Sequence, residues 1–207
     1  MDGAAAGHDS DNDVQDGDAS QRQDATRETS KLTDSDRGHR YGNFHNYYSF
    51  HPTGSRLDMM SEIFGVIGGT TSVSKRQKLS ADGSLPKFRY CDLGCNEGDL
   101  TIDVARSLQE CTRRRIEFEG IDIDPVLVSR ASKKWTNTET VAGSFRTADV
   151  CEAIKEMNDH SFDLISLLST TMWIHVHAGD AGLERLLLQM CDKAKHFILI
   201  EPQPSKW

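Results

Sequence analysis

The feature that most constrains the fold is a regular alternation of short apolar segments with helix-patterned segments from residue 87 onward. The strand-like segments cover residues 88–93, 116–123, 144–150, 162–168 and 197–200, and the helix-like segments between them cover 99–108, 126–134, 151–157 and 181–195. Segment 162–168 is almost continuously apolar, as in a central strand that is covered on both faces. The sequence therefore predicts an α/β fold, with a mostly parallel sheet, right-handed crossovers and helices on both faces.

Residues 1–40 differ from the rest of the chain in composition. They hold ten acidic and five basic side chains, and Val14 and Leu32 are their large apolar residues. Such a segment cannot bury enough apolar surface to offset the entropy of ordering it. We expect a disordered acidic tail at 1–40 and one domain at 41–207. The formal net charge of −8 belongs mostly to the tail and says little about a partner of the domain.

The start of the domain contains an amphipathic segment followed by a Gly-, Ser- and Thr-rich one. Residues 56–66 place Leu57, Met60 and Phe64 at helical spacing, which predicts a short helix. Residues 65–86 are predicted to be a flexible surface insertion. Its basic run at 75–78 suits solvated charges better than a contact with nucleic acid or a weak import signal.

Several classes of protein are disfavoured by composition. No stretch approaches the ~18 consecutive apolar residues of a membrane span, and the N-terminus is acidic, unlike a secretory signal. Five cysteines, an odd number, suit a reducing compartment. Cys91 and Cys95 fit small buried side chains better than a zinc site, because no second pair follows at suitable spacing. We expect no membrane contact, no required metal, and a cytoplasmic location, with the nucleus also open. The sequence says nothing about oligomeric state.

The first predicted strand ends in a glycine-rich turn, Asp92-Leu-Gly-Cys-Asn-Glu-Gly98. Gly94 and Gly98 allow a tight turn and a close approach of the backbone to a ligand. A dinucleotide-binding loop would carry a third glycine, whereas the next position is Asp99, which disfavours a nicotinamide-dependent oxidoreductase. Asp92 is either a ligand contact or a carboxylate that braces the loop.

Carboxylates also lie at the ends of the second and third predicted strands. Asp122 lies where a ribose diol would be bound, since an ionised carboxylate accepts two hydroxyl donors. Asp124 competes for this role, but it also precedes Pro125 and suits the N-cap of the next helix. Asp149 fits either an adenine-amine contact or the cap of the helix that follows. The carboxyl ends of parallel strands meet at one edge, so the pattern predicts a nucleoside-containing cofactor.

Together these motifs resemble class I S-adenosylmethionine methyltransferases. A narrower resemblance covers much of residues 41–207, and its motifs are Tyr41-Gly-Asn-Phe, Phe50-His-Pro, Asp92-Leu-Gly-Cys-Asn, Thr171-Met-Trp-Ile-His and Glu201-Pro-Gln-Pro204. They are similar to those of the bicoid-interacting protein family of RNA 5′-phosphate methyltransferases. The Phe50-His-Pro and Met172-Trp-Ile-His forms are closest to members that methylate 5′-monophosphates of precursor microRNA and transfer RNA.

The resemblance implies a cofactor, a partner and a set of site residues. The cofactor would be S-adenosyl-L-methionine and the partner a small RNA with a 5′-phosphate. The implied cofactor contacts are Arg56, Asp92, Gly94, Asn96, Asp122, Ile123, Asp149, Val150 and Met172. The implied catalytic residues are Tyr41, His45 and His175, and the implied substrate contacts are Trp173, Glu201, Pro202, Gln203 and Pro204.

Two departures from the family pattern accompany these expectations. The family has an aromatic residue directly after the second proline, whereas Ser205 and Lys206 precede Trp207 here. Class I sheets normally add two strands after the fifth, so the sheet is expected to be truncated. Other acceptors stay open at this point: an RNA 5′-triphosphate, a protein or a small molecule. A nonenzymatic RNA-binding module is the alternative of another class.

Overall fold

The computed structural model describes residues 45–72 and 87–202. Several of the predicted features lie outside the described residues: the tail at 1–40, the basic run at 75–78, Tyr41, Gln203 and Pro204.

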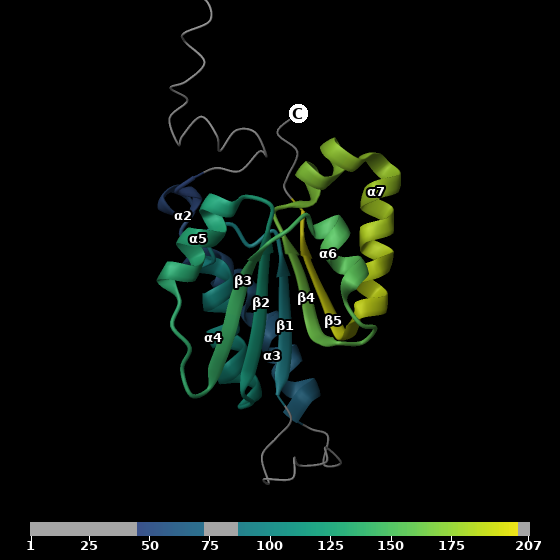
Figure 1. Cartoon of the computed structure of the whole chain (residues 1–207). Helices are drawn as coiled ribbons and strands as arrows, with labels where there is room; N and C mark the ends of the chain where they lie inside the picture. The colour runs from purple at the N-terminus through teal and green to yellow at the C-terminus, as the bar shows by residue number, and fades with distance from the viewer. Residues whose placement is uncertain (1–44, 73–86, 203–207) are drawn as a thin grey trace, which may run out of the picture.

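A parallel sheet of five strands, in the order β3-β2-β1-β4-β5, forms the centre of the described structure (Figure 1). The strands are β1 (Phe88–Leu93), β2 (Ile116–Asp122), β3 (Val141–Thr147), β4 (Phe162–Leu168) and β5 (Ala194–Glu201). The order reverses at β1, whose neighbours are β2 and β4. This is the topological switch point at which open α/β sheets bind their ligands. The predicted parallel α/β fold is confirmed.

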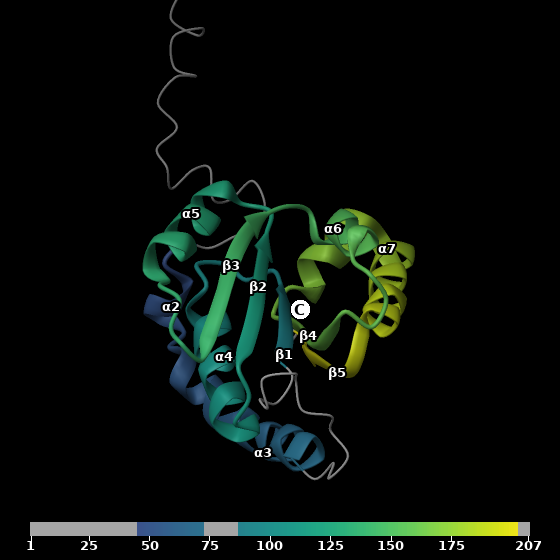
Figure 2. The ribbon, with the colours of Figure 1, turned by 60° about the horizontal axis from the view of Figure 1, so that its bottom comes forward.

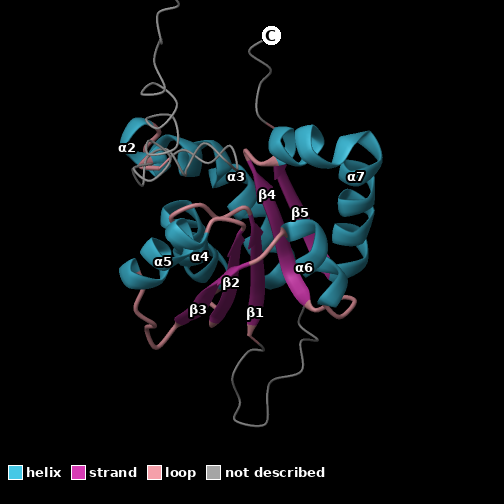
Figure 3. Ribbon diagram, turned by 45° about the horizontal axis from the view of Figure 1, so that its top comes forward, coloured by secondary structure: helices cyan, strands magenta, loops and turns pink. Residues whose placement is uncertain are grey.

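Helices cover both faces of this sheet (Figure 2, Figure 3). They are α2 (Tyr47–Phe50), α3 (Thr53–Ser72), α4 (Asp99–Thr112), α5 (Pro125–Lys134), α6 (Val150–Glu156) and α7 (Thr171–Lys193). Helices α3, α4 and α5 lie on one side, and α6 and α7 lie on the other. Successive strand residues point to opposite faces, so Tyr90 packs in the core beside α3 and α4, whereas Cys91 packs in the core beside α6 and α7.

The prediction of a flexible insertion beginning at residue 65 is wrong for residues 65–72, which continue α3. The physical reason is packing against α4. Ile67 is buried in the core, and a Cβ on Gly68 would meet the carbonyl oxygen of Cys111 at 2.7 Å. The glycine therefore allows two helices to approach closely. Glycine content alone suggested a loop, because it does not distinguish a turn from such a contact.

Other boundaries moved by a few residues or more. Strand β3 begins and ends three residues earlier than predicted, and β5 is longer at both ends. Helix α7 begins at Thr171 rather than 181, and it contains a kink at Gly179, where φ is 68°. No helix in the described ranges is long and apolar enough to cross a membrane.

The pairing of β2 with β3 generates a test of the core. Gly143 is aligned with Phe118, and a Cβ on Gly143 would lie 2.4 Å from that ring. We expect Gly143→Ala to lower the free energy of unfolding by about 1–3 kcal/mol through overpacking, measured by urea denaturation. Gly69→Ala in α3 is the matched control, because its Cβ would meet nothing within 4 Å. That change should be neutral or should stabilise the helix by up to about 1 kcal/mol. Equal effects of the two substitutions would contradict the packing argument.

Candidate functional site

A cavity of about 360 Å³ opens at the carboxyl ends of the strands. Its wall combines residues from the β1 and β4 loops, the ends of β2 and β3, and helices α2, α3, α6 and α7. The predicted cofactor residues that line it are Arg56, Gly94, Asn96, Asp122, Ile123, Asp149 and Val150, and the predicted substrate residue that lines it is Trp173. Seven of the nine predicted cofactor residues therefore line one cavity, and their contact with a cofactor stays a prediction.

Asp122 holds two loops together at the cavity wall. Its side chain is almost fully buried, with the Oδ2 atom accepting a hydrogen bond from the Asn96 amide at 2.8 Å and the Oδ1 atom accepting one from the Asp124 amide at 2.9 Å. Asp124 instead caps α5, where its Oδ1 accepts from the Val126 amide at 2.8 Å. Asp122 lines the cavity and Asp124 does not. The geometry favours Asp122 for a ribose contact.

The loops after β1 and β4 contain three left-handed residues that line the cavity. Gly94 has φ of 84°, and a Cβ there would lie 2.3 Å from the Thr170 hydroxyl oxygen. Asn96 and Ser169 have φ of 52° and 56° without being glycine. Asparagine tolerates this conformation, whereas for serine it carries strain. Such strain is often concentrated at ligand sites.

Asp149 caps α6 and also lies at the cavity. Strand β3 ends at Thr147, and the Asp149 side chain caps α6 by accepting from the Cys151 amide at 2.8 Å. The residue also lines the cavity. The adenine contact stays a prediction.

Asp92 lies beneath the cavity rather than in its wall. Its Oδ1 accepts a hydrogen bond from the Ser166 hydroxyl at 2.6 Å, and its Oδ2 accepts one from Thr101. Since Ser166 donates to Asp92, the Tyr90 hydroxyl donates to Ser166, at 2.9 Å. Burial raises the pKa of Asp92, against the opposing effect of these hydroxyl donors. Of the two roles considered from sequence, the structure supports bracing: Asp92 joins β1, β4 and α4.

Arg56 reaches from α3 into the cavity wall. Its Nη2 donates to the Ser169 hydroxyl at 3.2 Å and pairs with the Glu201 carboxylate. Its Nε is buried and has no hydrogen-bond partner in the described part of the chain. Glu201 was predicted to contact substrate, but it acts here as the counter-ion of Arg56 and does not line the cavity. An unpartnered buried donor in a cavity wall suits an anionic group of a ligand.

Four other predicted site residues do not line this cavity. His45 Nε2 lies 3.3 Å from Asp124 Oδ2, on the other side of the Asp122 loop. His175 is exposed and contacts Asp180, and Pro202 is exposed. Met172 is half-buried in the first turn of α7. The described arrangement gives the predicted catalytic roles of His45 and His175 no support.

Several residues of the cavity were missed from sequence. Tyr47 and Tyr48 line it, and they lie between the Tyr41-Gly-Asn-Phe and Phe50-His-Pro motifs. His177 lines it with its Nδ1 donating to the Trp173 carbonyl at 2.7 Å. Lys155 and Arg185 add positive charge from α6 and α7. No group of three or more potential metal-ligating side chains occurs within residues 45–72 and 87–202.

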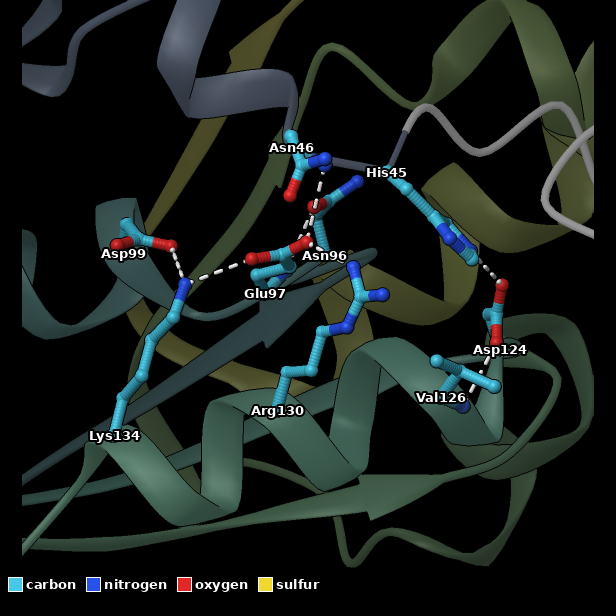
Figure 4. Close-up of polar contacts among 9 residues, drawn as sticks. All are labelled: His45, Asn46, Asn96, Glu97, Asp99, Asp124, Val126, Arg130 and Lys134. Atoms are coloured by element: carbon cyan, nitrogen blue, oxygen red, sulfur yellow. Dashed lines mark hydrogen bonds and ion pairs between the residues drawn. The ribbon is translucent and has the colours of Figure 1, made fainter. Parts of the chain in front are cut away.

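Glu97 follows Asn96 in the same loop and is almost fully buried. Its carboxylate accepts hydrogen bonds from Lys134 Nζ at 2.9 Å, from the Asn46 amide at 3.1 Å and from Arg130 Nη1 at 2.9 Å (Figure 4). Desolvation would raise the pKa of this group, but the three donors outweigh it and lower the pKa to about 2. No motif or spacing in the sequence predicted this network, because its members lie far apart in the chain.

Comparison with known proteins places this geometry in a family. The family model of Bicoid-interacting protein 3 (Bin3) matches residues 162–207. The pre-miRNA 5′-monophosphate methyltransferase of Xenopus laevis is 30% identical over 184 residues, which cover 80% of this chain and 67% of that protein. The chain belongs to the Bin3 family.

Two further relatives and one solved structure resemble this chain. The human RNA 5′-monophosphate methyltransferase is 30% identical, and the match covers 80% of this chain and 59% of that protein. The Drosophila melanogaster U6 snRNA methylphosphate capping enzyme Amus is 27% identical, over 83% of this chain and 56% of that protein. Monomeric WbdD has a TM-score of 0.54 at 20% identity, over 74% of this chain and 32% of that one, which supports the Rossmann-like fold.

The Glu97 network generates a prediction for acid titration. A carbon NMR titration of the Glu97 carboxyl should give a midpoint near 2, well below the ordinary value of 4.5. The lowered pKa means that the ionised carboxylate stabilises the fold above the ordinary value, and that this contribution disappears as the pH falls toward 2. A midpoint between 4 and 5 would mean that the three donors do not hold the carboxylate in solution.

Proposed function

We propose that the chain binds S-adenosylmethionine in this cavity and transfers its methyl group to the 5′-phosphate of a small RNA, a monophosphate in preference to a triphosphate. The observation that carries this proposal is one cavity, in a Bin3 family member, that has Asp122 at the end of β2 and the Arg56 guanidinium from α3 in its wall. The chain spans about two thirds of its frog relative and 59% of its human relative, both named for 5′-monophosphate methylation.

The residues of the cavity fit this cofactor group by group. The Asp122 carboxylate lies in the cavity wall at the end of β2, and a carboxylate is an acceptor that suits the hydroxyl donors of a ribose. Asp149 and Val150 lie at the start of α6, where they suit the adenine amine and ring. The Arg56 guanidinium in the cavity wall suits the cofactor's carboxylate, and its Nε has no hydrogen-bond partner among the described residues. Gly94, in a left-handed turn, also lines the cavity, where the absence of a side chain suits a close approach of the cofactor's methionine part.

The chemistry asks little acid–base work of the protein. Bound S-adenosylmethionine supplies an electrophilic methyl group, which forms a bond to oxygen as its bond to sulfur breaks. A phosphate oxygen is already anionic at neutral pH, so no side chain has to remove a proton. The residues of the cavity align the reacting groups, an effect worth up to ~7–11 kcal/mol in favourable systems.

The substrate side is assigned to the aromatic and basic groups of the wall. Tyr47, Trp173 and His177 offer hydrogen-bond donors and ring faces at the cavity. Such side chains can stack an RNA base and hold a terminal phosphate. Lys155 and Arg185 offer positive charge for the RNA backbone. The proposal includes a cytoplasmic location, with the nucleus as the alternative.

The cofactor assignment predicts the effect of Asp122→Ala. This change removes the proposed ribose acceptor and the link between two loops, so affinity for S-adenosylmethionine should fall by about a hundredfold or more, measured by calorimetry. Asp159→Ala is the control, because Asp159 is exposed and contacts Lys193 away from the cavity. Affinity of the Asp122→Ala protein within about twofold of the unaltered chain would refute the ribose assignment.

The acceptor assignment predicts a strict dependence on the RNA 5′ end. Matched RNAs with a 5′-monophosphate, a 5′-triphosphate or a 5′-hydroxyl would be incubated with cofactor carrying a labelled methyl group. We expect labelling of the monophosphate RNA, less of the triphosphate RNA, and none of the hydroxyl RNA. Equal labelling of the hydroxyl RNA would exclude a phosphate acceptor. Cofactor binding without labelling of any RNA would favour another acceptor.

A further inference from the structure

The segment before α2 is tied to the cofactor loops at two points (Figure 4). The Asn46 amide donates to Glu97 Oε1 at 3.1 Å, and His45 Nε2 lies 3.3 Å from Asp124 Oδ2. Glu97 belongs to the loop after β1, and Asp124 to the loop after β2. Residues 45 and 46 therefore contact both loops that meet at Asp122.

Each of these contacts continues directly to the Asp122 carboxylate. The Glu97 amide donates to the Asn96 side chain at 2.7 Å, and the Asn96 amide donates to Asp122 at 2.8 Å. On the other side, the Asp124 amide donates to Asp122 at 2.9 Å. Two short routes of hydrogen bonds thus lead from the segment before α2 to the proposed ribose acceptor.

Helix α2 depends on such outside contacts for its position. It has four residues, its N-cap side chain makes no capping hydrogen bond, and none of its residues is fully buried. A helix this short is not stable by itself. It nevertheless carries Tyr47 and Tyr48 into the cavity wall. The contacts of residues 45 and 46 therefore help to place these two rings, together with the packing of Tyr48 against the core.

Glu97 holds its end of the anchor with charge. Its side chain is 9% exposed, whereas those of Arg130 and Lys134 are 35% and 39% exposed. A buried carboxylate needs partners, and the two cations of α5 provide them. They leave one further acceptor site for the Asn46 amide. Helix α5 thereby fixes the orientation of the carboxylate that receives α2.

We propose that Glu97 is a positioning residue that, together with Asp124, fixes residues 45 and 46 and so holds Tyr47 and Tyr48 at the cofactor cavity. This inference rests on the proposed function of that cavity. It assigns to the carboxylate no contact with the cofactor or the RNA. Glu97 acts through the backbone of Asn46.

The test combines two measurements on Glu97→Ala in the full chain. Hydrogen exchange of the Asn46 amide should become about tenfold faster or more, because the amide loses a charged acceptor. Affinity for S-adenosylhomocysteine, measured by calorimetry, should weaken about fivefold or more, a common size of coupling between a site and a remote contact. Glu97→Gln keeps one acceptor oxygen and should rescue part of both effects. A role in stability alone would not produce this graded effect on one amide.

Asp99→Asn is the matched control. Asp99 shares Lys134 with Glu97, at 2.7 Å from Nζ, but within the described residues its side chain makes no hydrogen bond to residues 45 and 46. The Asp99→Asn substitution should leave the hydrogen exchange of the Asn46 amide and the affinity for S-adenosylhomocysteine unchanged. The two cations are half-exposed, so the loss of Glu97 leaves no buried charge and the fold should survive. If Glu97→Ala fails to fold, Lys134→Met provides a milder test with the same signs.

Three outcomes would overturn the inference. The first is unchanged exchange of the Asn46 amide in a folded Glu97→Ala protein. The second is faster exchange in that protein with unchanged affinity for S-adenosylhomocysteine. The third is an effect of Asp99→Asn on both measurements as large as that of Glu97→Ala. Failure of the unaltered chain to bind S-adenosylhomocysteine would count against the proposed function instead. The Asn46 exchange would still decide whether Glu97 anchors the segment before α2.

Discussion

The rest of the site depends on the two amide hydrogen bonds that the Asp122 carboxylate accepts. One donor, Asn96, belongs to the loop after β1, and the other, Asp124, follows β2. Parallel strands bring these two loops to one edge of the sheet, and the Gly94 and Cys95 amides continue the backbone pairing by donating to the Ile121 carbonyl. The Asp122 carboxylate adds links to the Asn96 and Asp124 amides. Because these donors are backbone amides, the links do not depend on the rotamers of neighbouring side chains.

Three buried acids near the cavity are stabilised in three different ways. Hydroxyl groups surround Asp92, and burial raises its pKa; backbone amides bind Asp122; and cations surround Glu97, whose pKa falls to about 2. Hydroxyl donors compensate burial only in part, whereas paired cations outweigh it. The different partners suit different tasks: Asp92 joins strands beneath the site, Asp122 spaces loops, and Glu97 holds the segment that brings two tyrosines to the wall.

Much of the fold could be predicted from sequence because it follows from local pattern. Strands β1 and β4 begin and end at the predicted residues, and the carboxylates after β1 and β2 mark the correct edge. What was missed depends on contacts between distant segments. The last turns of α3 include Gly68, which approaches Cys111 of α4, and the Glu97 network joins residues far apart in the chain. Tyr47 lines the cavity from the segment that follows Asn46, and no spacing rule in the sequence predicts that position.

The pair between Arg56 and Glu201 joins residues that are separated by 145 positions. During synthesis on the ribosome, the arginine emerges long before its partner. The guanidinium has no partner at residue 201 until β5 has been synthesised and has paired with β4. A chain stalled before residue 201 would therefore carry an arginine in its cavity wall without this ion pair.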